Sequence, residues 1–159
     1  MKELILVDAC NLLHRIPAWR DRLGQGMDVL AAELLTTLRP LHDLEHWELH
    51  LIIDGRGSAL HQEFIDRTRT LSLLWCAAHQ SADTVIESWI MRLNRDWRIV
   101  VASEDRAIAH TAISHGAEVL SAAALLAWVD RVLARYSRGQ QSRQQQSAKS
   151  FGNRLEGLL

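Results

Sequence analysis

The sequence predicts a single-domain α/β fold in which a mostly parallel five-stranded sheet is covered by helices. Short apolar runs of strand length alternate with segments of helical period, and repeated strand–helix units favour a parallel sheet with right-handed crossovers. The apolar runs are continuous, which is typical of strands buried on both faces. With 159 residues, of which 48 % are hydrophobic, the chain can enclose one core of ordinary size.

Five segments are expected to form strands, because each is a short apolar run that stops at a polar residue or a turn. Gly55 and Gly57, for example, mark a turn after the second run. The expected strands are residues 3–8, 47–53, 70–76, 98–102 and 117–120.

Helices are expected between and after these strands. Within one of them, Val85, Ile86, Trp89 and Ile90 share a face, as a helix packed on a sheet requires. Gly116 is expected to end the helix before it. The expected helices are residues 9–14, 27–39, a short one at 61–67, 82–94, 106–114 and 122–136.

The C-terminal part of the chain differs in composition from the rest. Residues 137–150 are rich in Gln, Ser and Arg and almost free of apolar side chains, so we expect a flexible linker there. Residues 151–159 regain apolar side chains and are expected to form a short segment that docks on the body or on a partner. The folded domain is therefore expected to span residues 1–136.

Charge is distributed unevenly along the chain. Residues 1–130 carry a net charge of −6 and residues 131–159 carry +5, although the whole chain is at −1. A basic segment favours contact with a polyanion such as RNA, and Arg138 and Arg143 are its candidate contacts. The alternative is a tail that only increases solubility.

The sequence favours a cytoplasmic protein without membrane contact. No apolar run reaches the roughly 20 residues needed to span a bilayer, and the first residues lead directly into a strand instead of a signal peptide. Two cysteines, Cys10 and Cys76, suit a reducing compartment.

Four aspartates lie where apolar runs end or where a helix begins. Asp8, Asp54 and Asp105 follow the first, second and fourth expected strands, and Asp83 opens the helix after the third. The carboxyl ends of parallel strands meet at one rim of the sheet, where ligands bind. Two carboxylates about 5 Å apart repel by about 3 kcal/mol at an effective dielectric constant of about 20. Such a cluster needs a cation, and Mg²⁺ or Mn²⁺ suits these oxygen ligands.

Each of these aspartates can instead cap the helix that follows it, which is a common role for this residue. We favour a metal site because all four positions carry Asp, although Ser, Thr and Asn cap equally well. Glu87 lies four residues after Asp83 on the same helix face, and it serves the same cation, points to solvent, or pairs with Arg56 or Arg106. The candidate metal ligands are Asp8, Asp83, Asp105 and Glu87, with Asp54 as a further catalytic or supporting carboxylate.

Two polar side chains are expected to support this cluster. Ser103 lies two residues before Asp105, and its hydroxyl can bond to that carboxylate and orient it. Asn11 follows Asp8 by three residues and can orient a ligand or a water molecule.

Three further side chains are candidate RNA contacts near this rim. Arg56 and Arg106 can bind phosphate with their guanidinium groups. Trp19 lies in a loop between arginines, where a base can stack on the indole ring, the alternative being a simple loop anchor.

In their order and spacing these residues resemble the YacP-like branch of NYN domains, which belong to the PIN-like nuclease superfamily. The resemblance covers residues 3–136, with Ala9 in place of the family's usual Gly and Glu104 in place of a small polar residue. The matching elements are Asp8 with Asn11, Asp54 with Gly55, Asp83 with Ile86 and Glu87, Ser103 with Asp105, and Gly116 with Ala117 before a closing helix.

The resemblance implies a three-layer α/β/α sandwich with strand order 3-2-1-4-5, in which Asp8 ends the central strand. It also implies a metal-dependent endoribonuclease that hydrolyses RNA phosphodiester bonds and leaves a 5′-phosphate. Some members of the family act on translated mRNA at the ribosome, so RNA and the ribosome are the implied partners.

Other functions are less consistent with the sequence. The chain has no Gly-x-x-x-x-Gly-Lys-Ser/Thr motif for an NTPase. Its two lysines, Lys2 and Lys149, do not supply the one that a phospho-receiver domain needs at its last strand. The main alternative is a catalytically inactive RNA- or ribosome-binding adaptor with the same fold, but an adaptor has no reason to maintain four repelling carboxylates.

Overall fold

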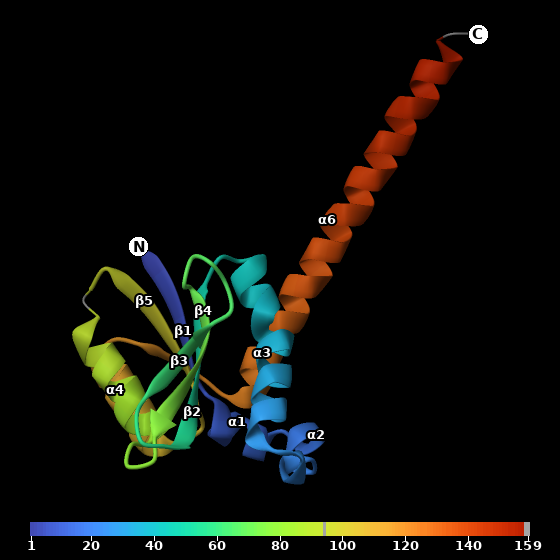
Figure 1. Cartoon of the computed structure of the whole chain (residues 1–159). Helices are drawn as coiled ribbons and strands as arrows, with labels where there is room; N and C mark the ends of the chain where they lie inside the picture. Colours follow the sequence, from blue (N-terminus) through green and yellow to red (C-terminus); the bar gives the residue numbers. More distant parts are fainter. Residues whose placement is uncertain (94, 158–159) are drawn as a thin grey trace.

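The structure, a computed structural model, describes residues 1–93 and 95–157, apart from the side chains of Arg56 and Leu155. Its centre is a six-stranded sheet with helices on both faces (Figure 1). The order is β3-β4-β2-β1-β5-β6, and every neighbouring pair is parallel except β3 and β4. The predicted α/β class is therefore confirmed. The strands are Lys2–Asp8 (β1), Glu48–Gly57 (β2), His61–Phe64 (β3), Leu71–Ala77 (β4), Trp97–Ala102 (β5) and Glu118–Leu120 (β6).

The helices form the two outer layers of the sandwich. Helices α1, α3 and α6 contribute buried residues to the apolar cluster on one face, and α4 and α5 contribute to the cluster on the other (Figure 1). Gly116, with a φ of 81°, follows α5 in the left-handed conformation expected at a helix end. The helices are Ala9–Arg15 (α1), Pro17–Arg20 (α2), the 3₁₀ turn Leu23–Gln25 (η1), Met27–Asp43 (α3), Ala82–Arg92 (α4), Arg106–Ser114 (α5) and Ala122–Glu156 (α6).

Strand β1 is central, which explains its continuous apolar run. Ile5 and Val7 belong to one apolar cluster, whereas Leu4 and Leu6 belong to the cluster on the opposite face. Strand β2 lies on one side of β1 and strand β5 on the other. The end of β1 is therefore held next to the ends of two parallel neighbours.

Strand β3 corrects one sequence-based prediction, because we expected a short helix at residues 61–67. The five predicted strands keep their predicted order, and β3 adds a sixth at the edge, antiparallel to β4. Its residues alternate between exposed and half-buried, with the period of two that a strand requires. Pairing with β3 also covers an edge of β4 that would otherwise leave backbone groups unpaired.

Helix α6 corrects a second prediction, because the linker expected at residues 137–150 is helical. The helix has 35 residues, and its second half projects away from the body (Figure 1). Gln, Arg, Ala and Lys are good helix formers, so the segment continues the helix without an apolar face. Phe151 is 65 % exposed and does not dock on the body. None of the helices in the described part of the chain combines the length and the apolar character of a membrane span.

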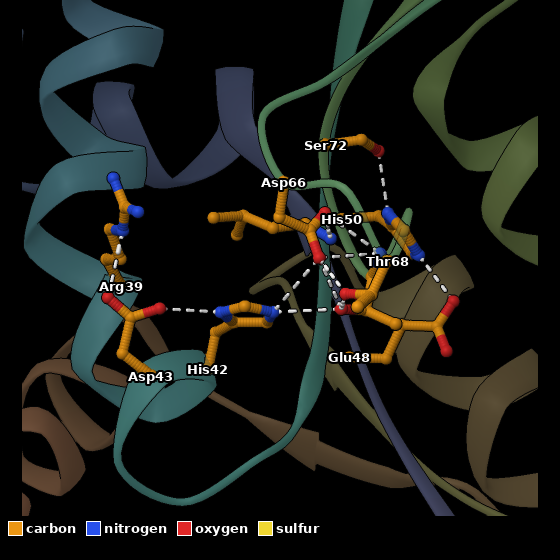
Figure 2. A network of polar contacts seen from close by, with 10 residues as sticks. Arg39, His42, Asp43, Glu48, His50, Asp66, Thr68 and Ser72 are labelled. Atoms are coloured by element: carbon orange, nitrogen blue, oxygen red, sulfur yellow. Dashed lines mark hydrogen bonds and ion pairs between the residues drawn. The ribbon is translucent and has the colours of Figure 1, made fainter.

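A polar network joins the end of α3 to the loop before β4, at the end of the sheet away from the carboxyl end of β1 (Figure 2). His42 contacts Asp43 through Nδ1 at 2.7 Å and Thr70 through Nε2 at 2.9 Å. Burial raises the pKa of Asp66, but hydrogen bonds from Thr68, Thr70 and the Leu71 backbone outweigh burial and hold this pKa well below its usual value. These bonds pair the polar groups of the loop with one another, so holding the loop in place is enough to explain the network.

Candidate active site

The four aspartates lie at the end of the sheet where the parallel strands terminate, opposite the N-terminus (Figure 1). Asp8 is the last residue of β1, and Asp54 lies near the end of β2. Asp83 is in the first turn of α4, and Asp105 immediately precedes α5. The electrostatic influence of Asp83 and Asp54 reaches Asp8, and that of Asp105 and Asp54 reaches Asp83. We call these four residues the rim carboxylates.

Asp8 is the most buried of the rim carboxylates, with 4 % of its surface exposed. The Asn11 backbone N–H donates to its Oδ1 at 3.4 Å, and the Ser103 hydroxyl donates to its Oδ2 at 3.2 Å. Burial, reinforced by the charges of Asp83 and Asp54, raises the pKa of Asp8 to about 6, although the two hydrogen bonds act in the opposite direction. A negative charge at Asp8 is therefore costly without a cation.

Ser103 holds a different carboxylate from the one that we predicted. Its hydroxyl bonds to Asp8 on the neighbouring strand and accepts a hydrogen bond from the Asp105 backbone N–H at 3.1 Å. The reason is the side-by-side position of β1 and β5, which places the end of β5 against Asp8. Ser103 thus couples two rim positions.

Asp54 and Asp105 are fixed by backbone N–H groups at helix starts. The Ala82 N–H donates to Asp54 Oδ1 at 2.7 Å. The N–H groups of Ala107 and Ile108 donate to Asp105 Oδ1 at 2.8 and 3.2 Å. The positive ends of α4 and α5 favour these charges. The Cys10 thiol also bonds to the Asp54 carboxylate, whereas the hydrogen bonds of the Asp105 side chain in the described contacts use Oδ1.

Asp83 lies in the first turn of α4, where its carboxylate bonds to its own backbone N–H. The N-cap of α4 is Ser81, whose hydroxyl accepts from the Thr84 N–H. Burial and the charges of Asp105, Asp54 and Glu87 raise the pKa of Asp83. Glu87 accepts a hydrogen bond from the Thr111 hydroxyl at 3.2 Å. Arg106 forms no ion pair with Glu87 in the described part of the chain, and the Arg56 side chain lies outside that part.

The loop after β5 is tied to α1 beside the rim. Asn11 Oδ1 accepts a hydrogen bond from the Glu104 backbone N–H at 2.9 Å, and Arg15 lies 3.6 Å from the Glu104 carboxylate. The Asn11 side chain therefore positions this loop through its carbonyl oxygen.

The rim fits a divalent cation in its chemistry. Its donors are all carboxylate oxygens, and no described Lys or Arg forms an ion pair with any of them. Within the described residues, no three His, Cys, Asp or Glu side chains are grouped closely enough to hold an ion by themselves. This arrangement suits Mg²⁺, which commonly uses one or two carboxylates together with water and substrate phosphate oxygens, better than a cation that needs a cage of protein ligands.

The side chains predicted to contact RNA lie in different parts of the structure. Trp19 lies in helix α2 and not in the expected loop. It is 9 % exposed and its indole Nε1 donates to Glu33 at 3.2 Å, so it anchors α2 and does not offer a stacking face. Arg106 is exposed beside the rim at the start of α5. Arg138 and Arg143 are exposed on α6. The Arg56 side chain lies outside the described residues.

The structure also places beside the rim a tryptophan that the sequence pattern assigns to the core or a strand edge. Trp75, one residue before Cys76 at the end of β4, is half-buried and pairs in register with Ile53, the residue before Asp54. It lines a cleft of about 810 Å³ that also contains Asp54. Its position near the end of a strand was the available signal in the sequence.

The raised pKa of Asp8 predicts how stability depends on pH without metal. The folded chain binds this proton more tightly than the unfolded chain, so stability falls as the pH rises from 3.8 to about 6. The loss from this group is expected to be up to about 3 kcal/mol. Asp8→Asn removes this titrating group, and asparagine can still cap α1. The free energy of unfolding, measured with urea in EDTA, should therefore decrease less between about pH 5 and pH 7.5 for Asp8→Asn than for wild type. Equal pH dependence of the two proteins would contradict this expectation.

Chains of known family or structure match this one over most of its length. The model of the YacP-like NYN domain family matches residues 5–157. The crystal structure of Rae1 (YacP) from Bacillus subtilis is similar with a TM-score of 0.70 and 21 % identity, over 94 % of this chain and 84 % of that one. A tryptophan-to-leucine mutant of the same protein gives a TM-score of 0.73 and 19 % identity, over 91 % and 85 %. No curated protein matches the chain in sequence.

Proposed function

Because this chain belongs to the YacP-like NYN domain family of the PIN-like nuclease superfamily, we propose that it is a metal-dependent endoribonuclease that hydrolyses phosphodiester bonds in RNA. The observation that carries the proposal is Asp83. Asp8, Asp54 and Asp105 each accept backbone N–H groups near helix starts, so helix capping alone can explain them. Asp83 is not the N-cap of α4, and although its carboxylate bonds to its own backbone N–H, burial and nearby carboxylates still raise its pKa. A cation bound at the rim explains why an acid is kept there.

The proposed roles follow from how each side chain is held. Asp8, Asp83 and Asp105 face the cation, directly or through water molecules bound to it, and Glu87 and Asp54 complete the negative surface around it. Ser103 and the Asn11 backbone keep Asp8 oriented, so the carboxylates are directed before RNA arrives. A bound divalent cation supplies charge that activates water and stabilises the leaving oxygen. We propose Mg²⁺ or Mn²⁺, since both accept carboxylate ligands.

We further propose that the substrate is single-stranded RNA, with mRNA at the ribosome as the setting, and that α6 contacts an RNA backbone. The segment 131–159 carries a net charge of +5, and α6 presents Arg138 and Arg143 to solvent. Arg135 pairs with Glu45 of the body and is less available. The projecting helix therefore supports a polyanion contact outside the rim.

Neutralising α6 is expected to weaken RNA binding without affecting the rim. The variant replaces Arg138, Arg143, Lys149 and Arg154 with Gln. The salt dependence of binding should become flatter by roughly 0.7 for each phosphate group that the variant no longer binds. The matched control replaces Gln140, Gln141, Gln144 and Gln145 with Ala, which keeps both the helix and the charge. Unchanged affinity and salt slope in the neutralised variant would show that α6 does not contact nucleic acid.

Cleavage of a mixed single-stranded RNA pool tests the proposed activity. We expect cleavage with Mg²⁺ or Mn²⁺, none in EDTA, and products that carry a 5′-phosphate. RNA binding without cleavage under all metal conditions would instead support an inactive adaptor.

A further inference from the structure

The cleft beside Asp54 continues between α3 and the sheet edge that β3 and β4 form. The first part, of about 810 Å³, is lined by Asp54, Cys76, His61 and residues around the start of α3. A second part, of about 570 Å³, is lined by Leu35, Arg39, Glu63 and neighbouring residues. Both parts share Asp28 and Trp75, so Trp75 lies where they meet.

Trp75 is left half-buried by the geometry of the layers. Leu71 and Leu73, on the same face of β4, are buried in the apolar cluster that α3 covers. Trp75 packs against that cluster but remains partly exposed, because it lies toward the end of β4, where α3 begins. Strands β2 and β3 flank it, at Ile53 and His61. Strand β4 therefore holds this indole on the α3 face of the sheet, in a cleft that one of the rim carboxylates, Asp54, also lines.

The charges of the cleft favour a base over a phosphate. Among the described lining residues, the acidic side chains are Asp28, Asp54 and Glu63. The basic ones are His14, His61 and Arg39, and Arg39 is paired with Asp43 at 2.9 Å. Phosphate groups would be repelled there, whereas a neutral base can stack on an aromatic ring. We propose that Trp75 forms a nucleobase-stacking subsite that positions single-stranded RNA next to the rim carboxylates. This proposal rests on the proposed nuclease function.

Binding in EDTA tests the subsite separately from cleavage. The probes are a ten-residue oligoadenylate and an abasic sugar–phosphate chain of the same length. Trp75→Met, which retains apolar volume, is expected to weaken oligoadenylate binding by about 5-fold or more and to leave binding of the abasic chain unchanged. Trp75→Phe should retain most of the affinity. The control Trp97→Met alters a half-buried tryptophan at the opposite end of the sheet and should change neither affinity.

Two results would overturn the subsite: oligoadenylate affinity that is unchanged in Trp75→Met, or an equal loss for both probes. If Trp75→Met does not fold, photo-crosslinking of 4-thiouridine RNA to the wild-type protein decides the matter. Crosslinks at Trp75 or its cleft neighbours support the subsite, and crosslinks confined to α6 overturn it. Trp75-dependent binding without any RNA cleavage would reject the nuclease and retain a base-binding site. Cleavage with Trp75-independent binding would reject the subsite alone.

Discussion

Replacing Asp83 with asparagine is expected to reduce metal-dependent RNA cleavage by about 100-fold or more while leaving the fold intact. Asparagine has nearly the same shape but removes a charge that burial and the neighbouring carboxylates disfavour, which are the two causes of the raised pKa of Asp83. The free energy of unfolding in EDTA should therefore be equal to that of wild type or higher. Single-turnover cleavage and urea denaturation measure the two effects.

The matched control for this variant is Asp21→Asn, which removes the same charge from an exposed position after α2. It should leave cleavage within about 2-fold of wild type, as is usual for a surface change away from a site. A marked loss of stability in Asp83→Asn, with cleavage reduced only in proportion to unfolding, would indicate a structural role for Asp83.

Gly55→Ala is expected to have the largest effect on stability. A Cβ at this position would lie 1.2 Å from the carbonyl oxygen of Cys76 and 2.3 Å from its carbonyl carbon. Both are backbone atoms of β4, so the pairing of β2 with β4 next to Asp54 must open. We expect a loss of about 4 kcal/mol or more in the free energy of unfolding, or no soluble protein.

Gly57→Ala is the control for that change, because a Cβ there has ordinary contact distances, the nearest atom being the Ala59 carbonyl oxygen at 3.8 Å. Its free energy of unfolding should lie within about 1 kcal/mol of the wild-type value. A Gly55→Ala protein as stable as this control would show that the two strands do not approach as described.

Much of the fold could be predicted from the sequence because its main strands are buried on both faces. The continuous apolar run of β1 and the one-sided apolar pattern of α4 are direct consequences of packing. Strand β3 could not be predicted in this way, since its four residues are partly polar and its partner β4 is formed only in the folded chain. The extension of α6 was missed because a solvated helix has no apolar face to signal it.

The candidate site was predictable in position but not in contacts. A parallel sheet brings strand ends to one rim, so the places of Asp8, Asp54 and Asp105 follow from the sequence. The bond between Ser103 and Asp8 joins residues on two strands, 95 positions apart, and needs the register of β1 with β5.

Tryptophan exposure likewise depends on tertiary packing. Trp19, in a segment expected to be a loop, is buried, whereas Trp75, in a segment expected to be a strand, is only half-buried and lines a cleft. Sequence alone could not distinguish them, because the exposure of Trp75 depends on where α3 begins above β4.

Sulfur substitution at a non-bridging oxygen of the scissile phosphate tests most directly whether a cation held by the rim carboxylates acts on RNA. Mg²⁺ prefers oxygen ligands and binds sulfur poorly, whereas Mn²⁺ tolerates it better. We predict that one phosphorothioate diastereomer is cleaved about 10-fold or more slowly with Mg²⁺ and that Mn²⁺ restores the rate. Equal slowing with both metals, or cleavage that persists in EDTA, would contradict a metal-dependent nuclease site at the rim.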